Sequence, residues 1–257
     1  MSTSLNEDFL RLIENSPFSV RQIEDQTETI FSTVLGNSKT IVKPNFESVS
    51  SNDLSLLFQL YDQKFFGGLC RKSLGNSPLD FRVSSRMTRA GGKTSRTIYR
   101  DQPNRPVYEI TVSSTLLFDT FDDVERTILV TGLECENRLQ ALQRIFEHEM
   151  VHLIEMLLWK KSSCSQNRFQ SIAARFFNHT DYQHQLVTPI ERALKIHGVQ
   201  QGSLVQFEFE GTKYQGVVNR ITKRATVLVE DRKGRRYSDG KRYSKFYIPM
   251  EALELIQ

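Results

Sequence analysis

Residues 139–159 read LQALQRIFEHEMVHLIEMLLW, a run without Gly or Pro in which apolar side chains recur every three or four positions. That spacing gathers the apolar side chains on one face of a helix. We therefore predict a buried amphipathic helix of about five to six turns over this run. The apolar face consists of Leu142, Phe146, Met150, Leu153 and Leu157.

The middle of this helix carries His148, Glu149 and His152. Two histidines four residues apart project from one side of a helix and can share a tetrahedral metal ion, and a glutamate after the first can reach a water molecule on that metal. Burying such groups is costly unless something satisfies them, which favours a metal site. The alternative is a pair of hydrogen-bonded core histidines beside a solvated glutamate. Glu155, one turn later, is expected to orient a histidine rather than to bind metal.

The composition is that of an ordinary soluble globular protein: 257 residues, 39% hydrophobic and 25% charged. No apolar run reaches the length of a membrane span, and the first residues lack the basic end and apolar block of a secretion signal. We expect a cytoplasmic protein with no membrane contact. The cysteines Cys70, Cys135 and Cys164 form no CxxC pair, which argues against a disulfide framework; two of them are expected to be buried thiols.

The first part of the chain predicts helices. Residues 1–50 are expected to form a helical extension, with helices over 6–15 and 19–35 and a polar linker around Pro44. A further helix is expected from Ser51, with Asp53 as its N-cap and Gly67-Gly68 as its stop.

A small sheet is expected between that helix and the histidine helix. Alternating apolar residues predict strands over 79–83, 107–112 and 128–130, with a turn or bulge at Gly91-Gly92. After Trp159 we expect a loop, a helix over 168–177 closed by Asn178, and a helix from Pro189 to Gly198 that Thr188 caps.

The chain changes character after residues 199–201, the predicted domain joint. Short alternating segments separated by Gly or charged turns predict a small SH3-like β-barrel over 202–257. The predicted fold class is α+β, with a helical extension over 1–50, a domain over 51–198 and the barrel.

The predicted barrel is basic. Between Lys213 and Lys245 there are eleven Lys or Arg against three acidic residues, with tyrosines among them, a composition suited to neutralising phosphates and stacking bases. The alternative is a solvated barrel surface with its aromatic residues in the core. If nucleic acid is bound, nucleoid or nuclear association follows. The predicted nucleic-acid-binding residues are Arg220, Lys223, Arg224, Arg235, Arg236, Lys241 and Arg242.

Four segments in order resemble the SprT-like (Spartan-type) metalloprotease family, over roughly residues 53 to 186. They are LFQLYDQKFFGGLC (57–70), SSRMTRAGG (84–92), ITVSSTLL (110–117) and ALQRIFEHEMVHLIEMLLW (141–159). The resemblance implies a zincin-like, zinc-dependent peptidase domain, a small sheet packed on helices. It also implies protein substrates, since family members cut DNA-bound proteins, including covalent DNA–protein crosslinks.

The chain departs from the family at the third zinc ligand. The family has a histidine in a His-Gly-x-x-Phe segment, and placing Phe169 on its phenylalanine puts Ser165 at the ligand position. Serine is not a usual zinc ligand, so we favour the neighbouring Cys164, whose thiolate binds zinc well. His179 is the other candidate, although it lies about 18 Å along the following helix. The alternatives are an ordinary loop thiol at Cys164 and helix-end histidines at His179 and His184.

These patterns together predict a zinc metallopeptidase. His148, His152 and Cys164 would hold Zn²⁺, and Glu149 would act as the general base. The strand around Ser85, Arg86, Met87 and Thr88 is expected to bind an extended protein substrate as an added strand. The alternative is a non-catalytic nucleic-acid or chromatin-associated binding protein with a structural zinc or none.

Overall fold

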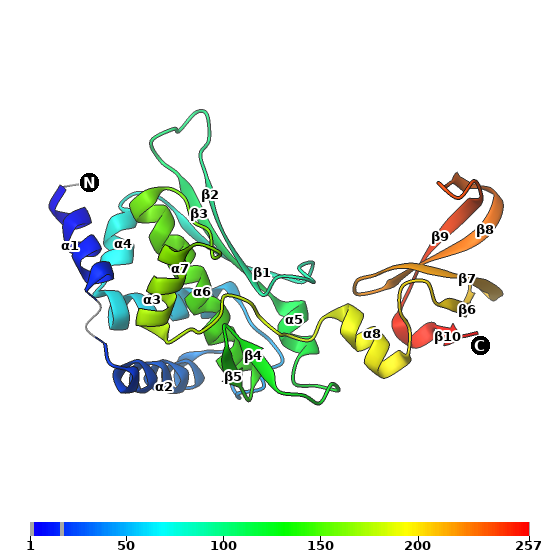
Figure 1. Cartoon of the computed structure of the whole chain (residues 1–257), viewed down its shortest axis with the longest axis horizontal. Coiled ribbons are helices and arrows are strands. Elements are labelled where there is room, and N and C mark those ends of the chain that lie inside the picture. The colour runs from blue at the N-terminus through cyan, green and yellow to red at the C-terminus, as the bar shows by residue number, and fades with distance from the viewer. Residues whose placement is uncertain (1–2, 16–17, 257) are drawn as a thin grey trace. The chain divides into compact units, whose positions relative to one another are not determined.

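The computed structural model describes residues 3–15 and 18–256, and its contacts divide the chain into two compact units (Figure 1). The first unit comprises Met1–Phe121 and Arg126–Leu186, and the second Asp122–Glu125 and Val187–Gln257. Each unit contains helices and strands, so the α+β class is confirmed. Helix α8 (Pro189–His197), which the predicted boundaries placed before the joint, clusters with the second unit.

The helices of the first unit begin and end where local sequence dictates. Helix α3 stops at Gly67, whose positive φ of 57° suits a residue without a side chain. Its predicted N-cap is wrong: Ser50 is the N-cap, and Asp53 lies at the third helical position, where its carboxylate accepts a hydrogen bond from the Ser50 backbone N–H at 2.6 Å. The helices are α1 (Thr3–Glu14), α2 (Val20–Asn37), α3 (Ser51–Phe66), α4 (Leu69–Leu74), α5 (Ser114–Asp119), α6 (Arg138–Trp159) and α7 (Asn167–Phe177).

A three-stranded sheet of the first unit lies against the histidine helix. Strand β3 (Val107–Ser113) is central, with β1 (Leu79–Ser84) parallel to it and β2 (Gly92–Thr97) antiparallel. At the predicted turn or bulge, Gly91 forms a bend, and Gly92 opens β2 and pairs with Val112. Helix α6 packs against β2, which is an edge strand. A separate hairpin joins β4 (Ile128–Val130) and β5 (Leu133–Cys135).

An aromatic core fixes α6 among its neighbouring helices. Tyr61, Phe65 and Phe66 of α3 and Phe176 and Phe177 of α7 are almost completely buried. The Phe66 and Phe176 rings stack with centroids 5.0 Å apart. Each such side chain contributes about 1.5–3 kcal/mol through burial, so α6, which contacts both helices, has little freedom to move.

The second unit contains α8 and a five-stranded antiparallel sheet in the order β10-β6-β7-β8-β9, coloured from yellow to red in Figure 1. Thr188 caps α8, Pro189 is its first residue and Gly198 closes it at φ 67°, as predicted. The sheet is open, with β9 and β10 at its edges, so closure into a barrel stays a prediction. Its strands are β6 (Leu204–Phe209), β7 (Thr212–Ile221), β8 (Ala225–Arg236), β9 (Arg242–Ile248) and β10 (Glu254–Leu255), with a 3-10 turn over Met250–Ala252.

Two expectations from composition can be compared with the structure. Cys70 and Cys135 are buried thiols and Cys164 is partly exposed, all three without a disulfide. Among the described helices, none combines the length and apolarity needed to cross a membrane.

Candidate metal centre

Helix α6 carries His148 and His152 one turn apart on the same side. The helix starts at the N-cap Asn137, whose side chain accepts a hydrogen bond from Gln140 N–H, so the histidines lie well inside it. Their ring centroids are 4.9 Å apart. Phe169 of α7 packs against both rings, at 4.8 and 4.5 Å. The structure therefore brings the two predicted ligands together and supports them from one side.

Both imidazoles are neutral at pH 7. Burial lowers the pKa of His148 to about 3 and that of His152 to about 4. A neutral imidazole has one nitrogen lone pair free to bind a metal. Within the described part of the chain, no group hydrogen-bonds to the His148 ring, whereas His152 Nδ1 lies 2.6 Å from Ser162 Oγ. The alternative of two hydrogen-bonded core histidines thus explains the environment of His152 Nδ1, but it does not explain the His148 ring, which has no hydrogen-bond partner among the described residues.

Cys164 joins the two histidines. Its Sγ and one nitrogen of each ring all lie within 4.8 Å of one another. The loop between α6 and α7 presents this thiol, and burial raises its pKa, so the free thiol is protonated at neutral pH. Binding a metal there requires the thiol to lose its proton.

The other two histidines of the first unit have separate partners. His179 is buried, and its Nε2 lies 2.8 Å from Glu147 Oε2. Nε2 of His184 accepts a hydrogen bond from the Gly91 backbone N–H at 2.9 Å. The structure thus places Cys164, and not His179, beside His148 and His152; metal binding by this set stays a prediction.

Glu149 lies under β2. The residue is 3% exposed, and Thr94 Oγ1 donates a hydrogen bond to Glu149 Oε2 at 2.7 Å. Burial raises the pKa of Glu149 to about 8, although the bond from Thr94 acts in the opposite direction. A Cβ atom added at Gly92 would lie 2.5 Å from Glu149 Oε1, so the glycine leaves room for the carboxylate.

A pocket of about 320 Å³ opens over these groups. Its walls combine the donors with apolar side chains of Ile145 and Val130. The pocket is lined by Arg89, Ala90, Gly91, Gly92, Lys93, Thr94, Val130, Thr131, Ile145, His148, Glu149, His152, Cys164, Tyr182, Gln183 and His184.

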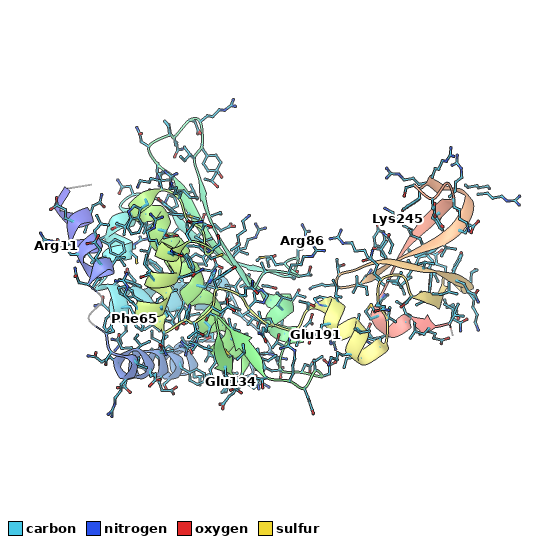
Figure 2. The ribbon with its side chains drawn as sticks, in the orientation of Figure 1. Arg11, Phe65, Arg86, Glu134, Glu191 and Lys245 are labelled. Atoms are coloured by element: carbon cyan, nitrogen blue, oxygen red, sulfur yellow. The ribbon has the colours of Figure 1, made fainter. Side chains whose placement is uncertain are left out.

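The four residues predicted to bind substrate lie outside this lining. Ser85, Arg86, Met87 and Thr88 form the turn after β1, and the exposed Arg86 is labelled in Figure 2. The backbone carbonyls of Ser85 and Met87 accept hydrogen bonds from the hydroxyls of Thr115 and Ser113. The segment that borders the pocket is the next one, from Arg89 to Thr94.

The donor set fits a zinc ion. Two imidazoles and a thiolate are ligands that zinc prefers, and with bonds of about 2.0–2.3 Å a tetrahedral site holds its donors about 3.3–3.8 Å apart. Donor separations within 4.8 Å leave only small side-chain adjustments to reach that spacing. Three protein ligands also leave a fourth position for water or substrate.

Two groups of residues at the site had no sequence prediction. Gly92 and Thr94 face Glu149 from β2, and Ser162 contacts His152 from the loop after α6. The pair on β2 has no local signal: residues two apart in a strand share a face, but GKTSRT lacks the apolar alternation that marks a strand. Ser162 has none either, since its role depends on how the loop folds back onto α6.

The predicted nucleic-acid-binding residues form two groups in the second unit. Arg220, near the end of β7, and Lys223 and Arg224, in the connection that follows, lie near the start of β8. Arg235 and Arg236 end β8, Lys241 lies in the next connection and Arg242 opens β9. At about 3.3 Å per residue the two groups are at most about 35 Å apart along the strand. Lys241 is already paired with Glu230 at 2.8 Å.

Comparison with known proteins adds no assignment. A scan against models of protein families, a search of curated proteins and a search of solved structures found no match to the chain. Functional inference therefore rests on the chemistry and geometry of the pocket.

Proposed function

We propose that the chain is a SprT-like zinc metallopeptidase that hydrolyses peptide bonds in protein substrates. His148, His152 and Cys164 would hold the zinc, and Glu149 would be the general base. The observation that carries the proposal is the convergence of three zinc-type donors, from a helix and a separate loop, beside a buried carboxylate at one pocket.

Zinc at this position would lower the pKa of a bound water to about 7 and polarise a peptide carbonyl, less strongly with a thiolate ligand than with a third imidazole. We therefore expect low or conditional activity. Glu149 supplies the proton transfer. Thr94 occupies Oε2, which leaves Oε1, once the carboxyl group is ionised, to take a proton from the attacking water and return it to the leaving amine. With a pKa of about 8, this base form increases as the pH rises through neutrality.

Strand β2 offers a place for the substrate backbone. It is an edge of its sheet, and its residues 92–94 line the pocket. An extended peptide can add to such an edge through main-chain hydrogen bonds. This proposal moves the substrate contact from Ser85–Thr88 to the segment that follows them.

The finer fold assignments belong to the same proposal. A histidine helix packed on an edge strand of a mixed sheet supports a zincin-like domain in the first unit. A buried apolar cluster on the sheet of the second unit, including Val205, Val218 and Val227, supports an SH3-like barrel. The basic ends of β8 support DNA as a partner, which would bring the peptidase to DNA-associated proteins.

The proposal is tested by a cleavage assay on protein substrates with and without DNA, at measured zinc occupancy. Glu149→Gln keeps the shape of the side chain but removes the base, so the rate should fall by about 10²–10⁴-fold with zinc retained. Glu134→Gln, at an exposed glutamate of β5 labelled in Figure 2, is the matched control and should leave the rate unchanged.

Absence of cleavage by fully zinc-loaded wild type under every DNA condition would show that the peptidase assignment is wrong. A non-catalytic nucleic-acid or chromatin-associated protein would then be the better description.

A further inference from the structure

A continuous series of polar contacts runs behind His152. Its Nδ1 lies 2.6 Å from Ser162 Oγ, which donates a hydrogen bond to Glu155 Oε2 at 2.6 Å. Arg168 Nε donates to the other oxygen, Oε1, at 2.5 Å. The guanidinium of Arg168 lies over the Trp159 ring, 4.2 Å from its centroid. The sequence predicts that Glu155 orients a histidine, but in the structure it reaches His152 through Ser162.

The series fixes where the proton of His152 lies. A serine hydroxyl has one hydrogen, and Ser162 gives it to Glu155. Ser162 Oγ can then only accept from the ring, so Nδ1 of the neutral His152 carries the proton. Nε2 is left with its lone pair, which is the atom and state required of a zinc ligand.

The same contacts hold the loop that carries Cys164. The Ser163 backbone N–H donates to Glu155 Oε2 at 3.3 Å, and Gln170 Nε2 donates to the Cys164 carbonyl at 3.3 Å. Glu155 is fully buried on α6, whereas Arg168 lies in the first turn of α7. The loop from Lys160 to Gln166 is therefore tied at both sides to the helices that enclose it.

We propose that Ser162, held by the Glu155–Arg168 pair, is a positioning residue that sets the Nδ1–H tautomer of His152 and the place of Cys164 within the donor set. The inference rests on the proposed function, because it assigns Ser162 a role toward the same metal. Partners of this kind at zinc-bound histidines typically change metal affinity by about 10–100-fold.

The test is a competition titration of the full-length protein with zinc and a chromophoric chelator. Ser162→Ala should weaken zinc binding by about 10–100-fold, and Ser162→Thr, which keeps the hydroxyl, should restore most of it. Ser163→Ala is the matched control. Among the described residues the Ser163 hydroxyl has a hydrogen bond only with Ser165 Oγ, at 3.1 Å, so this variant should bind zinc as the wild type does. With cobalt in place of zinc, the thiolate-to-cobalt absorption band should weaken in Ser162→Ala, because Cys164 is displaced as well.

Equal zinc affinity and an unchanged cobalt spectrum in Ser162→Ala and wild type would overturn this inference alone. A wild type that binds no zinc would overturn the proposed function and the inference together. Circular dichroism of each variant shows whether a loss of zinc binding comes from unfolding. If Ser162→Ala is unfolded, the folded Ser162→Thr variant is the test, and its failure to bind zinc would contradict the proposal.

Discussion

The carboxylate of Glu149 occupies the space that a side chain at position 92 would need. Its Oε1 is 2.5 Å from the Cβ position of Gly92, and the Thr94 hydroxyl holds Oε2. Placement of a general base matters because a misplacement of about 1 Å can cost about 100-fold in rate. Gly92 is therefore required for space rather than for backbone conformation.

Gly92→Ala should lower the cleavage rate by about 100-fold while the zinc content stays at the wild-type level, because the added methyl displaces Glu149 but neither histidine. Gly36→Ala is the control, since a Cβ there meets nothing within 4 Å and the residue lies in helix α2. Rates at equal zinc loading check the prediction. A Gly92→Ala rate within twofold of wild type would contradict this role.

Among the residues of the site, the sequence predicts those set by local spacing and misses those that tertiary contacts bring to the site. His148, Glu149 and His152 follow from helical spacing, and Cys164 from its place beside Ser165, the position that the family resemblance gives to the third ligand. Thr94 and Ser162 depend on β2 crossing α6 and on a loop folding back, which no short-range pattern encodes.

Among the elements, α6 is tied to its neighbours by a buried polar cluster on the side away from the pocket. Glu147 accepts hydrogen bonds from Tyr61 Oη of α3 at 2.7 Å and from Arg144 at 3.0 Å, and it lies 2.8 Å from His179 Nε2. Burial raises the pKa of Glu147, but the opposing effects of Arg144 and His179 are larger in sum and keep it below its usual value. The cluster is thus a charged network within the core.

Tyr61→Phe should lower the free energy of unfolding by about 1–3 kcal/mol, because it leaves the buried Glu147 short of one donor. Tyr99→Phe, at a tyrosine that is 53% exposed in the loop between β2 and β3, should change it by less than about 0.5 kcal/mol. Urea unfolding of the two variants measures both effects. Equal stability of the two variants would show that the Tyr61 hydroxyl contributes nothing.

Helices that end at a glycine or asparagine could be predicted from the sequence. Short helices, and a strand without apolar alternation, could not. Gly67, Asn178 and Gly198 end α3, α7 and α8 in left-handed conformations, as glycine and asparagine favour. The β2 sequence GKTSRT lacks the apolar alternation that marks a strand and forms one by pairing with β3. The short helices α4 and α5, with six residues each, fell below what periodicity can resolve.

For the whole molecule, basic side chains are concentrated in the second unit, between Lys213 and Lys245. The sheet of the second unit concentrates basic side chains near both ends of β8, and among the described residues neither Arg235 nor Arg236 forms an ion pair. The sequence predicted this basic segment and the α+β class, but not the division of the cations into two groups, because that depends on the length of β8, which runs from Ala225 to Arg236.

Binding of fluorescent single-stranded DNA should weaken steeply with salt, since the contacts are to phosphates. Replacing Arg235 and Arg236 by Gln should reduce the salt slope by about 1–2, whereas Arg11→Gln, on α1 of the first unit, should leave it unchanged. Anisotropy titrations at several salt concentrations measure the slopes. A Kd that does not change between low and moderate salt would argue against nucleic-acid binding.

The proposed zinc site of His148, His152 and Cys164 is the basis of the peptidase assignment. Its most direct measurement is the zinc content per chain after equilibration with zinc and removal of the excess. We expect one zinc in wild type, strongly reduced binding in Cys164→Ala and none in His148→Ala/His152→Ala, with full binding in His179→Gln, whose amide can still donate to Glu147. Equal zinc content in wild type and the double-histidine variant would contradict the account, and loss of zinc in His179→Gln but not in Cys164→Ala would contradict its third ligand.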